Sequence, residues 1–241
     1  MDKQKQKIIE TYKQKSNVDP FDSGRNRYAF QIYKHKVESN FLKKACEKID
    51  QKKIKVLDVA CGTGRMLPEI FSIEKEVEYY GLDTSKEMTD ILKKRAKLIK
   101  KDVKIYLKDA LKMPFKDNTF DIVYSFHLLW HIPFKEQKKI VDEMLRVTKK
   151  GGIIVFDFLN KNFIWEKTKK ILGKKTSKEI YKVNISRIKK LISKTKDIQI
   201  KKLSDAPIKN DSLYGLFNII NKFEKVLPSP FYHMIFVMAR K

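Results

Sequence analysis

Two histidines stand where they could move a proton. His127 and His131 lie four residues apart, just after an apolar run that ends at Ser125. An unperturbed imidazole titrates near neutral pH, so either one suits a general base that takes a proton from a hydroxyl, a phenol or an acidic carbon. The same spacing suits a pair of metal ligands on one helical face, but no third ligand stands beside them. We therefore predict base catalysis by His127 or His131 and no metal; the alternative is that they line a pocket or pack against Trp130.

A glycine turn is the second feature with chemical meaning. Gly62 and Gly64 follow the apolar run 54–59 and precede a predicted helix. Glycine allows main-chain conformations closed to other residues and lets a ligand approach without an intervening side chain. The N–H groups and the dipole at the start of the next helix add a partial positive charge there. The turn therefore predicts a site for a nucleotide-like ligand.

The spacing around this turn favours one class of nucleotide-like ligand. A dinucleotide site needs the pattern G-x-G-x-x-G, and Leu67 stands where its third glycine would be. Asp58 precedes Gly62 by four residues, and Asp83 ends a second apolar run. An acidic residue at such a strand end can accept hydrogen bonds from both hydroxyls of a ribose and would repel a 2′-phosphate.

Four separated motifs carry a resemblance to a known family. They are VLDVACGTG at 56–64, YYGLDTSKEM at 79–88, KDA at 108–110 with MPF at 113–115 leading into NTFDIVYS at 118–125, and RVTKKGGIIV at 146–155. With these motifs in family order and spacing, residues 54–158 resemble the core of class I S-adenosylmethionine-dependent methyltransferases, of the small-molecule group called methyltransferase type 11. The resemblance implies S-adenosylmethionine as cofactor; a nicotinamide enzyme and a bare α/β scaffold are the alternatives.

The resemblance also implies which residues hold the cofactor. The methionine part would lie on the main chain of the turn, with Asp58 near its ammonium group, and Asp83 would bind the ribose. Thr84 and Met88 would flank the adenine, and Asp109 would accept a hydrogen bond from its amino group. For the three acids, the alternative roles are ordering the turn, capping a strand end and lying in a surface loop. The full expected set is Asp58, Ala60, Cys61, Gly62, Gly64, Asp83, Thr84, Met88, Asp109, Ala110, Leu111 and Phe126.

The charge of the chain raises the question of a nucleic-acid partner. The formal net charge is +25, yet only 7 of the 54 basic residues are arginine. RNA sites depend on arginine and aromatic side chains, because a planar guanidinium stacks and binds in a fork whereas lysine is a point charge. The lysines are also scattered along every predicted helix, which favours ordinary solvated faces. A denser stretch at 161–202 leaves RNA or an anionic membrane surface open as a partner.

Departures from related patterns narrow the methyl acceptor. Residues 125–128 read SFHL where enzymes that methylate amino groups of adenine or cytosine carry N/D-P-P-Y/F/W. We therefore expect a small organic acceptor, such as a quinone precursor, a lipid headgroup or another secondary metabolite, methylated on oxygen, nitrogen or carbon. Two other functions stay open: a tRNA or rRNA methyltransferase that uses the lysine surface, and a cofactor-binding module that has lost catalysis.

The composition and length set further limits. Cys46 and Cys61 are the only cysteines, and they provide neither a disulfide framework nor metal-ligand spacing. No apolar run approaches the ~20 residues of a membrane span, and the N-terminal residues are polar. We expect a cytoplasmic protein without a transmembrane segment. The length of 241 residues suits one domain with additions; the sequence leaves the oligomeric state open.

Alternating strands and helices must position these residues. Apolar, β-branched runs predict strands at 54–59, 77–83, 103–107, 120–125 and 153–158, and helical patterns predict helices at 64–72, 85–100 and 134–148. Ser85 is the expected N-cap of the second helix, and the glycine pair 151–152 is expected to stop the third. A helix at 184–194 and strands at 198–203 and 231–239 follow. We predict an α/β, Rossmann-like, seven-stranded, mostly parallel sheet with helices on both faces; its antiparallel last strand is implied by the resemblance.

Additions surround this core. Residues 1–50 contain predicted helices at 4–14 and 28–49, and the resemblance makes them a lid over the cofactor; the alternative is a peripheral packing helix. Residues 51–241 form the expected methyltransferase domain, with insertions at about 160–183 and 209–229, the second carrying an apolar helical pattern at 211–227. The expected substrate pocket uses Tyr12, Arg25, Tyr28 and Trp130.

Overall fold

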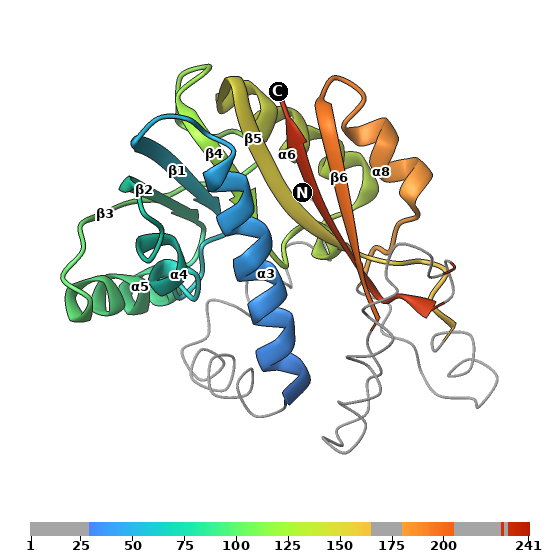
Figure 1. Ribbon diagram of the computed structural model, residues 1–241, viewed down its shortest axis with the longest axis horizontal. Coiled ribbons are helices and arrows are strands. Elements are labelled where there is room, and N and C mark those ends of the chain that lie inside the picture. Colours follow the sequence, from blue (N-terminus) through green and yellow to red (C-terminus); the bar gives the residue numbers. More distant parts are fainter. Residues whose placement is uncertain (1–28, 165–179, 205–227, 229–230) are drawn as a thin grey trace.

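The computed structural model describes residues 29–164, 180–204, 228 and 231–241. Within them, seven strands form one sheet in the order β3-β2-β1-β4-β5-β7-β6 (Figure 1). Strands β1 to β5 pair in parallel, whereas β7 runs antiparallel to β5 and β6. The predicted mostly parallel sheet is therefore confirmed. The strands are β1 (Lys53–Val59), β2 (Glu76–Asp83), β3 (Val103–Leu107), β4 (Phe120–Ser125), β5 (Thr148–Leu159), β6 (Lys196–Leu203) and β7 (Met234–Arg240).

The sheet has a hydrophobic core on each face. Successive side chains of a strand point to opposite faces, so the neighbours Val56 and Leu57, both fully buried, belong to different cores. The first three described helices cover one face, and α6 and α8 cover the other (Figure 1). Helices on both faces are what a parallel sheet requires. The helices are α3 (Ala29–Glu47), α4 (Leu67–Phe71), α5 (Lys86–Leu98), α6 (Phe134–Val147) and α8 (Ile185–Leu191).

Helix α3 is the predicted helix 28–49. Its buried residues Val37, Phe41, Leu42 and Ala45 recur at helical spacing and face the sheet. The ring of Phe41 lies 6.3 Å from that of Phe236 in β7. The described part of α3 is thus packed over the sheet; the lid role of residues 1–50 stays a prediction.

Several predicted features lie outside the described residues. They are the helix 4–14, the pocket residues Tyr12, Arg25 and Tyr28, the apolar pattern at 211–227 and most of the insertion 160–183.

The helix expected at 64–72 is shorter than predicted. Gly62 and Gly64 adopt left-handed backbone angles, with φ of +52° and +72°, which a right-handed helix does not allow. Helix α4 therefore begins only at Leu67, with Pro68 in its first turn. The glycine turn is therefore a structural unit of its own, and the helix start expected at Gly64 lies three residues further along the chain.

The role predicted for the glycine pair 151–152 is wrong. Helix α6 ends at Val147, and β5 begins at Thr148, five residues before the predicted strand. The register of β5 against β4 shifts in this stretch, and Gly151 has a φ of +80°. Its N–H donates to the carbonyl of Lys241 at 3.0 Å. The pair thus forms an irregular start of β5 that receives the C-terminal residue.

Two helix starts follow the local sequence. The Ser85 hydroxyl accepts a hydrogen bond from the N–H of Met88 at 3.2 Å, which confirms Ser85 as the N-cap of α5. The Asn184 side chain caps α8 in the same way through the N–H of Arg187 at 2.9 Å. Such caps satisfy N–H groups that have no partner within the helix.

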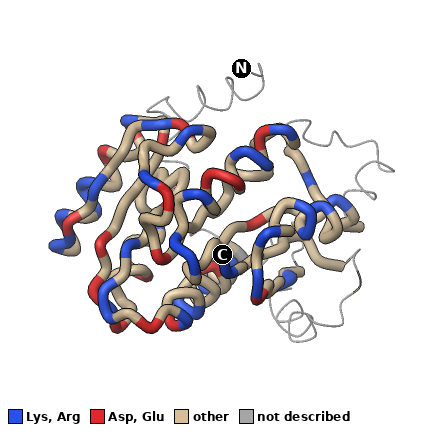
Figure 2. The backbone as a smooth tube through the Cα atoms, turned by 90° about the horizontal axis from the view of Figure 1, so that it is seen from above, with Lys and Arg blue, Asp and Glu red and all other residues tan. Residues whose placement is uncertain are grey.

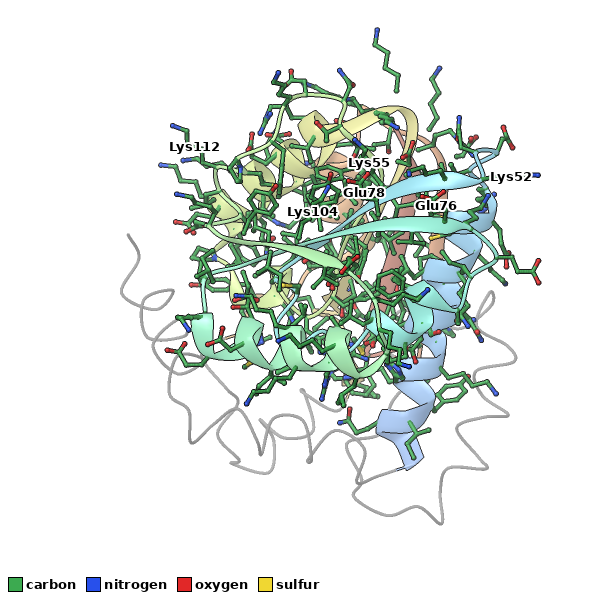
Figure 3. All side chains as sticks on the ribbon, turned by 90° about the vertical axis from the view of Figure 1, so that its left-hand side faces the viewer. Lys52, Lys55, Glu76, Glu78, Lys104 and Lys112 are labelled. Carbon is green, nitrogen blue, oxygen red and sulfur yellow. The ribbon has the colours of Figure 1, made fainter. Side chains whose placement is uncertain are left out.

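Charged side chains line one face of the sheet near the start of β1, β2 and β3. Lys55, Glu78 and Lys104 lie close together (Figure 3); Lys55 Nζ is 3.9 Å from Glu78 Oε2, and Lys104 also pairs with Glu78. Lys53 pairs with Glu76 at 2.5 Å. Opposite charges on neighbouring strands stabilise a sheet. The lysines in this region are therefore paired with acidic side chains and do not form a continuous basic surface.

None of the described helices is both long enough and apolar enough to cross a membrane. The cytoplasmic location expected from the sequence stays a prediction.

Candidate functional site

A cavity lies at the carboxyl ends of β1, β2 and β4, where ligands of parallel sheets bind. The structure gathers most of the predicted site residues there, from four separate loops. Those that line the cavity are Asp58, Ala60, Cys61, Gly62, Asp83, Thr84, Met88, Asp109, Ala110, Phe126, His127 and His131.

Three other predicted residues are described but do not line the cavity. The ring of Trp130 packs against the rings of His127 and His131, with centroids 5.4 Å away in each case, so it supports both histidines. The N–H of Leu111 donates to Asp109 Oδ1 at 2.9 Å. Gly64 has a packing role: a Cβ there would lie 2.7 Å from Leu92 Cγ.

Substitution of the two turn glycines separates strain from packing. Gly64→Ala combines a left-handed backbone with the clash against Leu92, so we expect a loss of about 3 kcal/mol in the free energy of unfolding. Gly62→Ala meets no atom within 4 Å and should lose only about 1 kcal/mol through its backbone. Chemical denaturation measures both; equal losses would show that the Leu92 contact does not matter.

The turn after β1 is tied to the end of β2. The N–H groups of Ala60 and Cys61 donate to the carbonyl of Leu82, at 2.8 and 3.1 Å. Ala60 itself has a φ of +60°, a strained conformation for a residue with a side chain. The N–H of Gly62 donates to Asp83 Oδ2 at 2.8 Å. These bonds hold the cavity floor in one shape.

Asp83 retains capacity for a ligand. Its Oδ2 accepts from Gly62 and its Oδ1 from the N–H of Ser85 at 2.9 Å. An ionised carboxylate offers about four acceptor sites, so the group keeps acceptor capacity for a donor in the cavity even with the main-chain N–H groups of Gly62, Thr84 and Ser85 bonded to it. Burial raises the pKa of Asp83, although the main-chain N–H bonds oppose this. A pair of neighbouring hydroxyls fits this arrangement.

Asp58 is a buried acid with no cation in direct contact among the residues that the structure describes. Its Oδ2 accepts hydrogen bonds from the hydroxyls of Tyr79, at 2.9 Å, and Tyr124, at 2.6 Å. Burial raises its pKa to about 7, even though the two tyrosine bonds oppose the shift. A positively charged group in the cavity would favour its ionised form. An ammonium group of a ligand would therefore be stabilised beside Asp58.

His127 is held from two sides. Its backbone is left-handed, with φ of +66°, and its N–H donates to Asp157 Oδ1 in β5 at 2.7 Å. Its Nε2 lies 2.6 Å from Oε1 of Glu38 in α3, and its side chain is 9% exposed. His131 ends the short 3₁₀ helix η2 (Leu129–His131) and lines the same cavity.

Glu38 and Arg65 extend the contacts of His127. Arg65 Nη2 lies 2.6 Å from Glu38 Oε2, and the Arg65 guanidinium also contacts His35 Nδ1. His35 Nε2 in turn lies 2.8 Å from Glu69 Oε1. Burial raises the pKa of Glu38, but His127, Arg65 and Lys34 outweigh this effect and hold the pKa well below its usual range.

Asp157 has the opposite protonation behaviour. Burial, with the nearby Glu38 charge, raises its pKa to about 7. Its Oδ2 lies 4.0 Å from His127 Nε2. Two carboxylates of different proton affinity therefore flank one imidazole, which is how environments separate acid and base roles.

Sequence reasoning missed Glu38, Arg65 and Asp157. Glu38 shares the apolar face of α3, and Asp157 interrupts the apolar run of β5, so each is a charge at a core position. That conflict was a usable signal, because buried acids are rare unless paired. Arg65 carried no such signal.

The same residues bear on the metal question. Glu38, His127 and Asp157 offer ligand atoms within 4.8 Å of one another. The sequence shows no third metal ligand beside the two histidines, but the fold brings two carboxylates to His127. Arg65 and Lys34, however, act electrostatically on both carboxylates and already balance their charge.

Comparisons with known proteins find similarity to methyltransferases, in sequence and in fold. Residues 57–156 match the family model described as a methyltransferase domain. A demethylmenaquinone methyltransferase of Geobacillus sp. (strain WCH70) is 36% identical over 107 residues, which are 44% of this chain and 45% of that protein. A tRNA (carboxymethyluridine(34)-5-O)-methyltransferase of Xenopus tropicalis is 30% identical over 125 residues, 51% of this chain and 18% of that protein. The chain thus matches less than half the length of these curated relatives.

A solved structure matches the whole chain. Magnesium protoporphyrin IX methyltransferase from Synechocystis PCC 6803, crystallised with bound S-adenosylhomocysteine (SAH), has a TM-score of 0.67 at 15% sequence identity. The match covers 99% of both chains. At this identity the likeness shows the shared fold.

Proposed function

From the methyltransferase domain that residues 57–156 match, we propose that this chain is a class I S-adenosylmethionine-dependent methyltransferase and that it methylates a small organic acceptor. The observation that carries the proposal is the cavity, which joins the glycine turn, Asp83 and His127 at one edge of the sheet. Bound there, S-adenosylmethionine supplies a methyl group on a sulfonium, a donor that is already activated. The protein then has to align the acceptor and exclude water.

The described residues fit this cofactor. Asp83 keeps acceptor capacity for hydroxyl donors of the ligand, and Asp58 is a buried acid that a cation would ionise. The main chain of Ala60 to Gly62 offers an open surface, since a Cβ at Gly62 would meet nothing within 4 Å. Asp109 and Ala110 line the same cavity after β3, where the adenine would lie.

Proton transfer falls to one of the two histidines. Both line the cavity, but His127 has a carboxylate 2.6 Å from its Nε2 and a main-chain bond to Asp157. A carboxylate partner orients an imidazole and increases its basicity. We therefore propose His127 as the base and His131 as a residue that shapes the acceptor pocket.

Cofactor binding should release a proton from Asp58. The carboxyl has a pKa of about 7 in the folded protein and about 3.9 in the unfolded protein. Its contribution to the free energy of unfolding therefore falls as pH rises from about 4 to 7. An ammonium beside it lowers that pKa, and SAH should therefore bind more tightly as pH rises through 7. Calorimetry in buffers of different ionisation enthalpy measures the released proton. Asp58→Asn should abolish the part of the proton release that comes from Asp58. Unchanged proton release in this variant would contradict the assignment.

Two experiments test the proposal as a whole. Calorimetry with S-adenosylmethionine, SAH and a nicotinamide dinucleotide should show binding of the first two only. Methyl-labelled donor, incubated with the protein and fractionated cell extract, should then label a small organic fraction. Binding of the nicotinamide dinucleotide alone would overturn the proposal, and cofactor binding without label in any fraction would favour the catalytically silent module.

RNA is the second candidate substrate, favoured by the name of the Xenopus relative and by the net charge of +25. Lys and Arg are, however, spread along the described backbone and alternate with Asp and Glu in the view of Figure 2, and glutamates pair with the lysines at the start of β1 to β3 (Figure 3). Label in the RNA fraction, with RNA binding that weakens steeply as salt rises, would favour this candidate.

A further inference from the structure

The charged residues around His127 exceed what cofactor binding needs. Glu38 and Lys34 come from α3, Arg65 from the segment after the glycine turn, and Asp157 from β5. Among the described residues, these are the charged side chains that interact with one another around this imidazole. Glu38 and Asp157 are buried, at 0% and 1% exposure. Burying two acids is costly unless each is paired with a cation or hydrogen-bonded.

We propose that Glu38 and Asp157 position His127 for acceptors that lose a proton when methylated, such as a phenol, an enol or an alcohol. The inference rests on the proposed methyl transfer. The acceptor proton moves to Nδ1 of His127 while the acceptor atom bonds to the methyl carbon. The carbon–sulfur bond breaks, and its electron pair stays on sulfur. His127 is the catalytic residue; Glu38 and Asp157 are positioning residues.

Glu38 decides which ring nitrogen can accept the proton. Its carboxylate is held in the ionised form, and an ionised carboxylate only accepts hydrogen bonds. Nε2 of His127, 2.6 Å from Glu38 Oε1, must therefore donate. In the neutral ring this leaves the lone pair on Nδ1. The dyad thus selects one tautomer before any acceptor binds.

Asp157 acts on the backbone and on the product of proton transfer. Its Oδ1 accepts the N–H of His127, which holds a left-handed conformation that costs about 1–3 kcal/mol in a residue other than glycine. Its Oδ2 lies 4.0 Å from Nε2 and has no hydrogen-bond partner among the described residues. Once the ring gains a proton, the ionised Glu38 favours the charged form, and Asp157 adds to this effect when it is ionised.

A divalent metal is the competing occupant of these three side chains. It would have to displace the contact between Glu38 and Nε2 and would add two charges beside Arg65, which lies 2.6 Å from Glu38. A proton at the imidazole needs no such change. Metal binding is therefore an outcome that the experiment must be able to detect.

The test reads the imidazole directly. The full chain is labelled with ¹⁵N-histidine, and ring spectra are recorded from pH 5 to 9 without acceptor, with His127→Asn used to assign His127. We expect the Nε2–H tautomer of His127. In Glu38→Gln its titration midpoint should move to lower pH by about one unit, because an opposite charge has been removed. Asp157→Asn, whose amide oxygen still accepts the main-chain N–H, should give a smaller shift in the same direction.

Glu69→Gln is the matched control. It removes a carboxylate from the Nε2 of His35 in the same network, without a contact to His127. The titration of His127 should not change. Once an acceptor is found, Glu38→Gln should lower kcat at neutral pH about 10–100-fold and leave the KM for the methyl donor within about threefold.

Three results would overturn the inference: an Nδ1–H tautomer in the wild type, an unchanged His127 midpoint in both folded carboxylate variants, or a stoichiometric divalent metal that Glu38→Gln loses. SAH calorimetry on the same samples tests the proposed function separately. If SAH fails to bind while the tautomer and shifts are found, the methyl-transfer proposal fails and the arrangement around His127 stands.

Discussion

Asp83→Asn should weaken the binding of SAH about a hundredfold. The carboxylate is expected to accept hydrogen bonds from both ribose hydroxyls, and a bond to a charged acceptor contributes roughly 1.5–3 kcal/mol. In the wild type, both carboxylate oxygens accept N–H groups, from Gly62 and Ser85. The amide of the variant keeps one acceptor oxygen, but its NH₂ group must face one of these main-chain donors. Calorimetry with SAH measures the loss.

Asp90→Asn is the control for this variant. Asp90 is an acid of α5 that pairs with Lys86 at 2.5 Å and does not line the cavity. It should bind SAH as the wild type does. If Asp83→Asn stayed folded and bound SAH with unchanged affinity, the ribose would have to lie elsewhere, and the assignment of the cavity to this cofactor would be wrong.

His127→Asn should lower kcat about 10²–10⁴-fold, the usual contribution of a positioned general base. Asparagine is chosen because it tolerates the left-handed backbone at this position, where φ is +66°. It also keeps the N–H that donates to Asp157. The substitution thus removes the imidazole and leaves the turn. Turnover is measured with the acceptor fraction identified by label transfer.

The comparison with His131→Asn decides between the two histidines. His131 lines the cavity but ends a 3₁₀ helix, so its loss should cost turnover about tenfold or less through the shape of the pocket. SAH affinity should stay within about threefold in both variants. A full loss in His131→Asn with near-normal turnover in His127→Asn would exchange the two roles.

Local patterns carried most of the fold. The alternation of apolar runs and helical patterns predicts β1 to β4 and α5 to within a few residues, because each depends on neighbours close in the chain. The two main errors are at glycines. The helix predicted from Gly64 begins at Leu67, and the pair at 151–152 lies inside β5. In both places a left-handed glycine lies against a residue distant in the chain. Leu92 occupies the space that a Cβ at Gly64 would need, and the N–H of Gly151 donates to the carbonyl of Lys241.

The candidate site divides in the same way. The turn, Asp83 and the two histidines belong to short segments at strand ends, and parallel strands bring their carboxyl ends to one edge, so sequence could group them. The acids around His127 could not be grouped. Glu38 is 89 residues away along the chain and Asp157 is 30, and no local period relates them.

The amino-acid sequence by itself determined the order of strands and helices, the cofactor turn and the acid at the end of β2, because these depend on side-chain alternation and on glycine conformations within short segments. Only the tertiary structure decided which charges meet at His127. That meeting requires β5 to lie beside β4 and α3 to lie across the sheet. Both follow from burying two hydrophobic cores at once, a property of the whole chain that no single segment encodes.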